Sequence, residues 1–76
     1  MSEGLVTRIK KRLAIFDADI ARLKVAEDED NLLLNMMSKD DPARKTVESR
    51  LTQVLAMSRA STIRADELRG LLENVE

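Results

Sequence analysis

A basic cluster near the start of the chain, at positions 8 and 10–12, is the first candidate for chemistry. At the beginning of a helix, basic side chains oppose the helix dipole, which is unfavourable unless another charge compensates. One interpretation is that Arg8, Lys11 and Arg12 form a polyanion surface that contacts nucleic acid phosphates or an acidic partner. The other is neutralisation by acidic residues near the end of the chain, such as Asp66 and Glu67.

Small and hydroxylated residues gather in the second half of the chain and form a second candidate site. The candidate groove for an anionic ligand consists of Ser58, Arg59, Ser61, Thr62 and Arg64. If two chains associate here, the hydroxyls would line a groove between subunits, and the arginines would donate charge-assisted hydrogen bonds to the anion. The alternative is a close approach of two helices, in which larger side chains of the other helix fill the space above these small residues.

The acidic run at residues 27–30 lacks the glycine and the ligand spacing of a calcium-binding loop. Adjacent carboxylates on a helix point in different directions, so we expect a solvated or arginine-paired patch. The chain contains no His and no Cys, the residue types that most often supply acid–base catalysis, nucleophiles and ligands for zinc or haem. No spacing singles out a nucleophile and its base. We therefore predict a protein that is not an enzyme and holds no metal and no cofactor.

Two helices are predicted to position these residues. Apolar or small residues recur with alternating spacings of three and four, the pattern of a packed helix seam. In the first half the pattern comprises Val6, Ile9, Leu13, Phe16, Ile20, Leu23, Leu34 and Met37. In the second half it comprises Val47, Leu51, Val54, Ser58, Ser61, Ala65, Leu68, Leu72 and Val75. We call these positions the seam.

The strongest turn signal lies between the two patterns, near residues 39–42. Asp41 can cap a helix whose first residue is Pro42, because proline needs no hydrogen-bond partner there and its fixed φ suits a helix start. The expected fold class is therefore all-α. We predict a single domain over residues 1–76, an antiparallel two-helix hairpin with helices at about 3–38 and about 42–75.

A turn between Asp40 and Asp41 sets position n of the first helix opposite position 81 minus n of the second, so that seam positions meet seam positions. Phe16 then faces Ala65, and large side chains meet small ones as close packing requires. The same turn brings the basic start of the chain, with a charge of +3 over residues 1–12, against an end with −3 over residues 65–76. It also brings the acidic run at residues 27–30 near Arg44, Lys45 and Arg50.

Glu27 and Asp30 interrupt the seam, because an unpaired carboxylate in a helix interface is expensive. One solution is a break near residues 27–31, followed by a short helix that Asp28, Asp30 or Asn31 caps. The other, which we favour, is a continuous helix that is kinked or locally rotated, so that residues 26 and 33 enter the core. The second helix has an alternative break at Ser61 or Thr62.

Apolar residues outside the seam are too numerous for an isolated hairpin. They are Leu5, Ile15, Val25, Leu32, Leu33, Met36, Leu55, Met57, Ile63 and Leu71. Below about 80 residues, a single core seldom stabilises a chain without disulfides, a metal or a partner. We therefore expect a homo-oligomer, a four-helix bundle or a larger ring. The predicted oligomer interface consists of Ile15, Leu33, Met36, Leu55, Ile63 and Leu71.

The longest apolar run, residues 32–34, is far shorter than the roughly 20 residues that span a bilayer. We expect no membrane partner. The absence of Cys agrees with a reducing compartment, and the expected localisation is cytoplasmic.

Two resemblances bear on function. In outline, two seams joined by one turn resemble the small helical hairpins that dimerise into four-helix bundles, such as plasmid copy-number regulators that bind paired RNA loops. At the turn, Pro42-Ala43-Arg44 followed by Leu51-Thr52 is similar to the hairpin domain of phage proteins that sequester cyclic-nucleotide immune signals. The first resemblance covers architecture only, and no site residue is carried over from either family.

These patterns predict a small oligomeric helical protein that acts by binding and blocking or tethering a partner. Its first partner is another copy of itself, and the second is another protein. Two alternatives remain: a hairpin that binds nucleic acid through its basic N-terminal turn, and a phage-type sponge that sequesters a cyclic nucleotide at the subunit interface.

Overall fold

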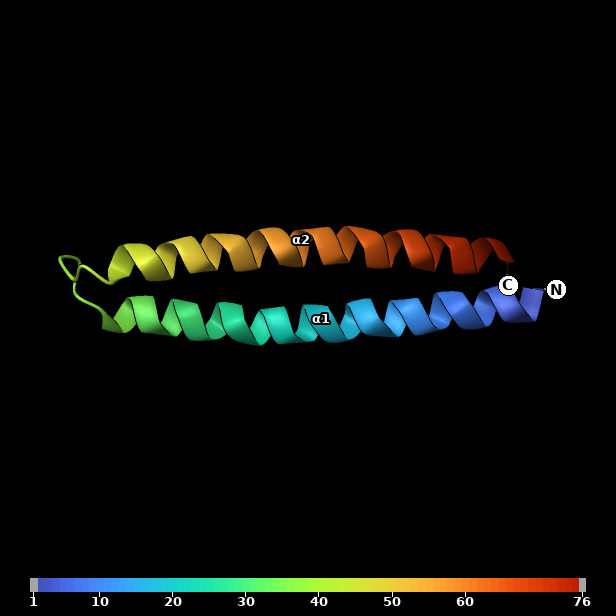
Figure 1. Ribbon diagram of the computed structural model, residues 1–76, viewed down its shortest axis with the longest axis horizontal. Helices are drawn as coiled ribbons and strands as arrows, with labels where there is room; N and C mark the ends of the chain where they lie inside the picture. Colours follow the sequence, from blue (N-terminus) through green and yellow to red (C-terminus); the bar gives the residue numbers. More distant parts are fainter. Residues whose placement is uncertain (1, 76) are drawn as a thin grey trace.

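The structure is a computed structural model that describes residues 2–75, with side chains from residue 4 onward. It consists of two antiparallel helices, α1 (Ser2–Met36) and α2 (Arg44–Val75). The helices lie side by side over their whole length, so that the start of α1 and the end of α2 share one end of the molecule (Figure 1). The hairpin measures 59 × 14 × 13 Å. The predicted helical hairpin is confirmed, with its turn where the sequence indicated.

The turn is held by hydrogen bonds that its own residues supply. Asp41 Oδ1 accepts a hydrogen bond from the Ala43 backbone N–H at 2.9 Å, and its carbonyl accepts one from the Arg44 N–H at 3.0 Å. Asp41 therefore caps the second helix, as predicted. The regular helix begins at Arg44, two residues later than the expected start at residue 42, because Pro42 and Ala43 form a turn ahead of it.

Arg44 also closes the end of α1. Its Nη1 donates to the carbonyl of Leu34 at 3.0 Å and to that of Met37 at 3.4 Å. The last carbonyls of a helix lack intrahelical partners, and a cation is favourable near them. The guanidinium thus satisfies the C-terminus of one helix from the first turn of the other.

Burial follows the seam that the sequence predicted. Every expected seam position on both helices is buried or half-buried, and the most buried apolar side chains are Ile9 at 6%, Val47 at 6% and Ala65 at 0% exposed. The helices are joined by ion pairs between Asp30 and Arg50 and between Asp17 and Arg69. The predicted register sets position 51 opposite Asp30, so the observed partner, Arg50, agrees with that register to within one residue.

Helix α1 runs through residues 27–31 without a break, as the favoured alternative predicted. The seam keeps its spacing through Glu27, which is half-buried, and Asp30, which is 4% exposed. Of the two residues that the predicted rotation brings into the core, Ala26 is half-buried, whereas Leu33 stays 39% exposed. The helix accommodates a buried carboxylate because Arg50 of α2 pairs with it. Helix α2 likewise continues through Ser61 and Thr62.

The large apolar residues outside the seam are exposed throughout the part of the chain whose side chains the structure describes. They are Leu5, Ile15, Val25, Leu32, Leu33, Met36, Leu55, Met57, Ile63 and Leu71, with exposed fractions between 39% and 76%. Two helices bury one stripe each, so the remaining apolar surface of this hairpin faces outward. Among the described residues, neither helix combines the length and the hydropathy of a membrane-spanning segment.

Candidate interaction surface

The hairpin has two unlike sides along its length. On one side, Arg69 Nη2 contacts Asp17 Oδ1 at 2.6 Å, and Arg69 also contacts Asp66 at 3.3 Å. Asp17 and Arg69 each follow a seam residue directly in the sequence. We call this the ion-paired side; it also carries Lys10, Lys24 and Asn31 of α1 and Glu48, Leu55 and Thr62 of α2.

The opposite side carries shallow cavities, and we call it the grooved side. Three cavities there are lined by residues that directly precede a seam position on each helix. They include Arg12, Asp19, Ala26 and Leu33 of α1 and Arg50, Met57 and Arg64 of α2. Leu5 and Leu71 occupy equivalent positions near the free end and are 49% and 50% exposed. The grooved side is therefore the more apolar and the more indented of the two.

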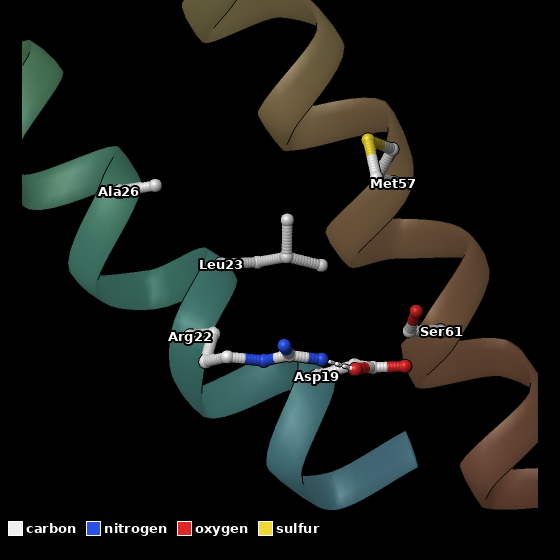
Figure 2. Close-up of a pocket in the computed structure, with 6 residues that line it drawn as sticks. All are labelled: Asp19, Arg22, Leu23, Ala26, Met57 and Ser61. Atoms are coloured by element: carbon white, nitrogen blue, oxygen red, sulfur yellow. Dashed lines mark hydrogen bonds and ion pairs between the residues drawn. The ribbon is translucent and has the colours of Figure 1, made fainter. Parts of the chain in front are cut away.

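The central cavity has a volume of about 420 Å³ and is lined by Asp19, Arg22, Leu23, Ala26, Met57 and Ser61. Figure 2 shows Leu23 pointing into the space between the helices, toward the part of α2 that carries Met57 and Ser61. Arg22 pairs with Asp19 on the same helix, one turn away. The charges of Arg22 and Asp19 balance one another at the rim of the cavity. Its remaining lining is mostly apolar.

The cavity near the turn has a volume of about 310 Å³ and is lined by Glu29, Asp30, Leu32, Leu33, Met36 and Arg50. Asp30 Oδ1 accepts hydrogen bonds from Arg50 Nε at 3.0 Å and Nη2 at 2.6 Å. The other carboxylate oxygen, Oδ2, is buried and receives no hydrogen bond from the described residues. A buried carboxylate oxygen without a donor is costly, so the hydrogen bonds that Arg50 donates to Oδ1 offset only part of the cost of burying Asp30.

The same contact shifts the pKa of Arg50. The hydrogen bonds that the Arg50 guanidinium donates to Asp30, and then the negative charge of that carboxylate, raise the pKa of Arg50 above its ordinary value. Glu29 adds a smaller effect in the same direction. Arg50, like any arginine, is cationic at physiological pH, and its contact with Asp30 lies on the grooved side.

The cavity toward the free end has a volume of about 120 Å³ and is lined by Arg12, Phe16, Arg64, Glu67 and Leu68. The guanidinium carbon of Arg12 lies 5.9 Å from the centre of the Phe16 ring, within the range of a cation–π contact. Arg12, one of the predicted polyanion-binding residues, therefore belongs to the grooved side.

The predicted polyanion surface, Arg8, Lys11 and Arg12, is exposed. The three side chains share one broad face of α1, because positions three and four apart are neighbours on a helix. The alternative, neutralisation by the end of the chain, is not seen as ion pairs among the described side chains. Asp66 instead contacts Arg69, and Glu67 shares the free-end cavity with Arg12 at a distance beyond an ion pair.

Within the single hairpin, the residues of the predicted groove between subunits lie on more than one face of α2. Ser58 and Ser61 are half-buried in the seam, whereas Arg59, Thr62 and Arg64 are exposed. Ser61 lines the central cavity, and Arg64 lines the one near the free end. Helix geometry explains this separation, because Arg59 and Thr62 are neighbours on one face, whereas Arg64, two residues after Thr62, lies on a different face.

The predicted oligomer-interface residues are exposed but do not share one side. Leu33 and Met36 line the cavity near the turn, and Leu71 lies on the grooved side. Leu55 directly follows a seam residue and lies on the ion-paired side. Sequence reasoning identified the uncovered residues but treated them as one set.

The predicted register brings the acidic run at residues 27–30 near Arg50, and the structure shows this proximity as the contact between Asp30 and Arg50. The sequence did not predict that the Asp30 carboxylate is buried at this contact. Among the described residues, no group of three carboxylates is arranged to hold a metal ion. Comparisons with protein-family models, with curated proteins and with solved structures find no match for this chain.

Proposed function

We propose that this protein is a non-enzymatic helical interaction protein that works as a homo-oligomer and acts by binding and blocking or tethering a partner. The observation that carries the proposal is the contrast between a thin core and a wide apolar surface. Ile9, Val47 and Ala65 are the buried apolar residues of the described chain, against ten large apolar side chains that are exposed.

Physical chemistry supports association as the role of that surface. Each large apolar side chain that leaves water contributes roughly 1.5–3 kcal/mol, and chains of this size seldom reach a stable fold from one core alone. The exposed residues run along the length of a rod 59 Å long, which suits side-by-side packing of helices. A second hairpin is the simplest molecule with matching length and pattern.

The experiment that tests the proposal is thermal unfolding at increasing protein concentration, followed by circular dichroism. A native state that is an oligomer gains stability by mass action, so its Tm rises with concentration. We expect a clear rise between micromolar and hundred-micromolar protein. A Tm that does not change over this range would contradict the proposal.

A second candidate function is nucleic-acid binding by Arg8, Lys11 and Arg12, because all three are exposed on one face and lack ion-pair partners among the described side chains. Contacts to phosphate weaken steeply as salt increases. A gel-shift series over salt therefore tests this function, with the triple alanine variant as the control. The absence of any shift of single- or double-stranded probes at low salt would exclude it.

A further inference from the structure

Helix α1 carries a second stripe besides its seam. It has the same alternation of three and four residues and lies on the grooved side, where Asp19, Ala26 and Leu33 line the cavities. The second stripe consists of Leu5, Arg8, Arg12, Ile15, Asp19, Arg22, Ala26, Glu29, Leu33 and Met36. A repeat of this spacing over the whole helix is the geometry with which a helix packs against another of similar length. The stripe contains both apolar and charged residues, so its order of charges constrains what can cover it.

The charges of this second stripe are self-complementary about its centre. We propose that a second copy of this chain covers it, with the two α1 helices antiparallel and a two-fold axis between Ile20 and Ala21. Position n of one copy then faces position 41 minus n of the other. Arg12 faces Glu29, and Asp19 faces Arg22. Each of these contacts occurs twice, because an interface of this symmetry is isologous. This inference rests on the proposed function.

The apolar residues of the stripe follow the same rule. Leu5 faces Met36, and Ile15 faces Ala26, so that a large side chain meets a flexible or a small one. Leu33 faces the aliphatic part of Arg8, whose charged end reaches water. Leu5, Ile15 and Met36 are 49%, 58% and 76% exposed in the single hairpin, and the second copy removes them from water.

A parallel arrangement of the same helices is disfavoured by the same residues. In a parallel pair each position faces itself, so Arg12 meets Arg12, Asp19 meets Asp19, and Glu29 meets Glu29. Like charges that face one another across a helix pair are destabilising, whereas opposite charges set the orientation. The antiparallel arrangement turns each of these repulsions into an attraction.

Cysteine cross-linking tests the register in the full chain, which contains no native cysteine. Two single variants, Ile15→Cys and Ala26→Cys, are mixed and oxidised. We expect a disulfide-linked dimer in the mixture and little in either variant alone. In the proposed register, two residues at position 15 are offset by 11 positions, about 16 Å along the helix, which exceeds the reach of a disulfide.

Exchanging the charges at two exposed positions, Arg12 and Glu29, tests the register a second time through the affinity of association. Arg12→Glu or Glu29→Arg alone places like charges together twice per dimer, and each is expected to weaken association about tenfold. The double variant R12E/E29R restores both contacts, and we expect its affinity within about threefold of the parent. The two positions lie about 25 Å apart on one helix, so the rescue cannot act within a chain.

The outcomes separate this inference from the proposed function. A monomer at all concentrations contradicts both. A dimer without the mixed cross-link and without rescue by R12E/E29R contradicts the inference alone and leaves self-association intact. Cross-linking of Ile15→Cys with itself indicates a parallel pair and likewise overturns the antiparallel register.

Discussion

Asp30 and Arg50 form the best-defined polar contact between the two helices, with Asp30 Oδ1 accepting from Arg50 Nε at 3.0 Å and Nη2 at 2.6 Å. The carboxylate is 4% exposed, whereas the side chain of Arg50 is 54% exposed. The pair is therefore asymmetric: removal of the arginine strands a buried charge, and removal of the carboxylate leaves a cation that water can solvate.

This asymmetry predicts different effects for the two partners. Arg50→Met leaves the Asp30 carboxylate buried without a counter-charge, and we expect a drop in Tm of roughly 5 °C or more. Asp30→Leu removes the buried charge and places an apolar side chain in the seam, so its Tm should fall less or rise. Thermal melts of both variants at one concentration make the comparison.

A matched control for that comparison is Lys24→Met. Lys24 contacts Asp28 at 3.3 Å, and both side chains are more than 60% exposed. Such pairs along one helix contribute at most about 0.5 kcal/mol. If Arg50→Met lowered the Tm no more than Lys24→Met does, or less than Asp30→Leu does, the cost assigned to the unpaired buried carboxylate would be wrong.

The pKa of Arg50 determines how its contribution to the stability of the fold depends on pH. Folding raises that pKa, so the stabilisation is fully present below the unfolded-state pKa and is lost only as the pH rises through the folded-state value. Both lie far above neutrality. The difference in Tm between the parent and Arg50→Met should therefore stay constant from about pH 7 to about pH 10, whereas a decline in this range would contradict the assignment.

The cap at the turn predicts a local loss of stability. Asp41→Ala removes the acceptor for the Ala43 N–H, and we expect a cost of about 1 kcal/mol. Asp40→Ala is the control, because it removes the same charge one residue earlier without removing that acceptor. Urea titrations of the two variants measure the difference, and equal midpoints would argue against the cap.

Packing at the seam predicts that size matters at Ala65. This side chain is 0% exposed, so Ala65→Leu overfills the interface and should cost about 1–3 kcal/mol. Ala56→Leu makes the same change at an exposed position of α2 and should alter stability by less than about 0.5 kcal/mol. Similar denaturation midpoints for the two variants would show that the helices can separate to admit a larger residue at position 65.

The difference between the two sides of the hairpin predicts which apolar residues join the copies. Leu33 on the grooved side and Leu55 on the ion-paired side are 39% and 42% exposed, so they form a matched pair. Leu33→Ser should weaken association about tenfold, and Leu55→Ser should change it by less than about threefold. Sedimentation measures both, and the reverse order would place the interface on the ion-paired side.

The seam, the turn and the exposed apolar residues could be predicted from the sequence because each depends on local spacing. The alternation of three and four identifies a buried stripe, and Asp41 before Pro42 identifies a helix start. Spacing alone made Glu27 and Asp30 unpaired carboxylates in the seam, so the sequence predicted a break or a rotation of the helix there, although the predicted register placed the acidic run near Arg50. The partner of Asp30 lies 20 residues away, and only the register between the helices brings it close.

The role of Arg44 was missed for a related reason. Its sequence position suggested pairing with the acidic run, but in the structure its Nη1 binds the carbonyls of Leu34 and Met37. Backbone carbonyls at a helix end are not visible in a pattern of side chains, and the end of α1 at Met36 is earlier than the expected residue 38. Contacts to the backbone therefore need the three-dimensional turn before they can be assigned.

Sedimentation equilibrium of the purified full chain tests the central claim, self-association, most directly. The chain mass is 8.6 kDa. We predict a species of twice that mass or more at tens of micromolar protein, with dissociation accompanied by loss of helix on dilution. A folded, helical species of 8.6 kDa over the whole concentration range would contradict the account.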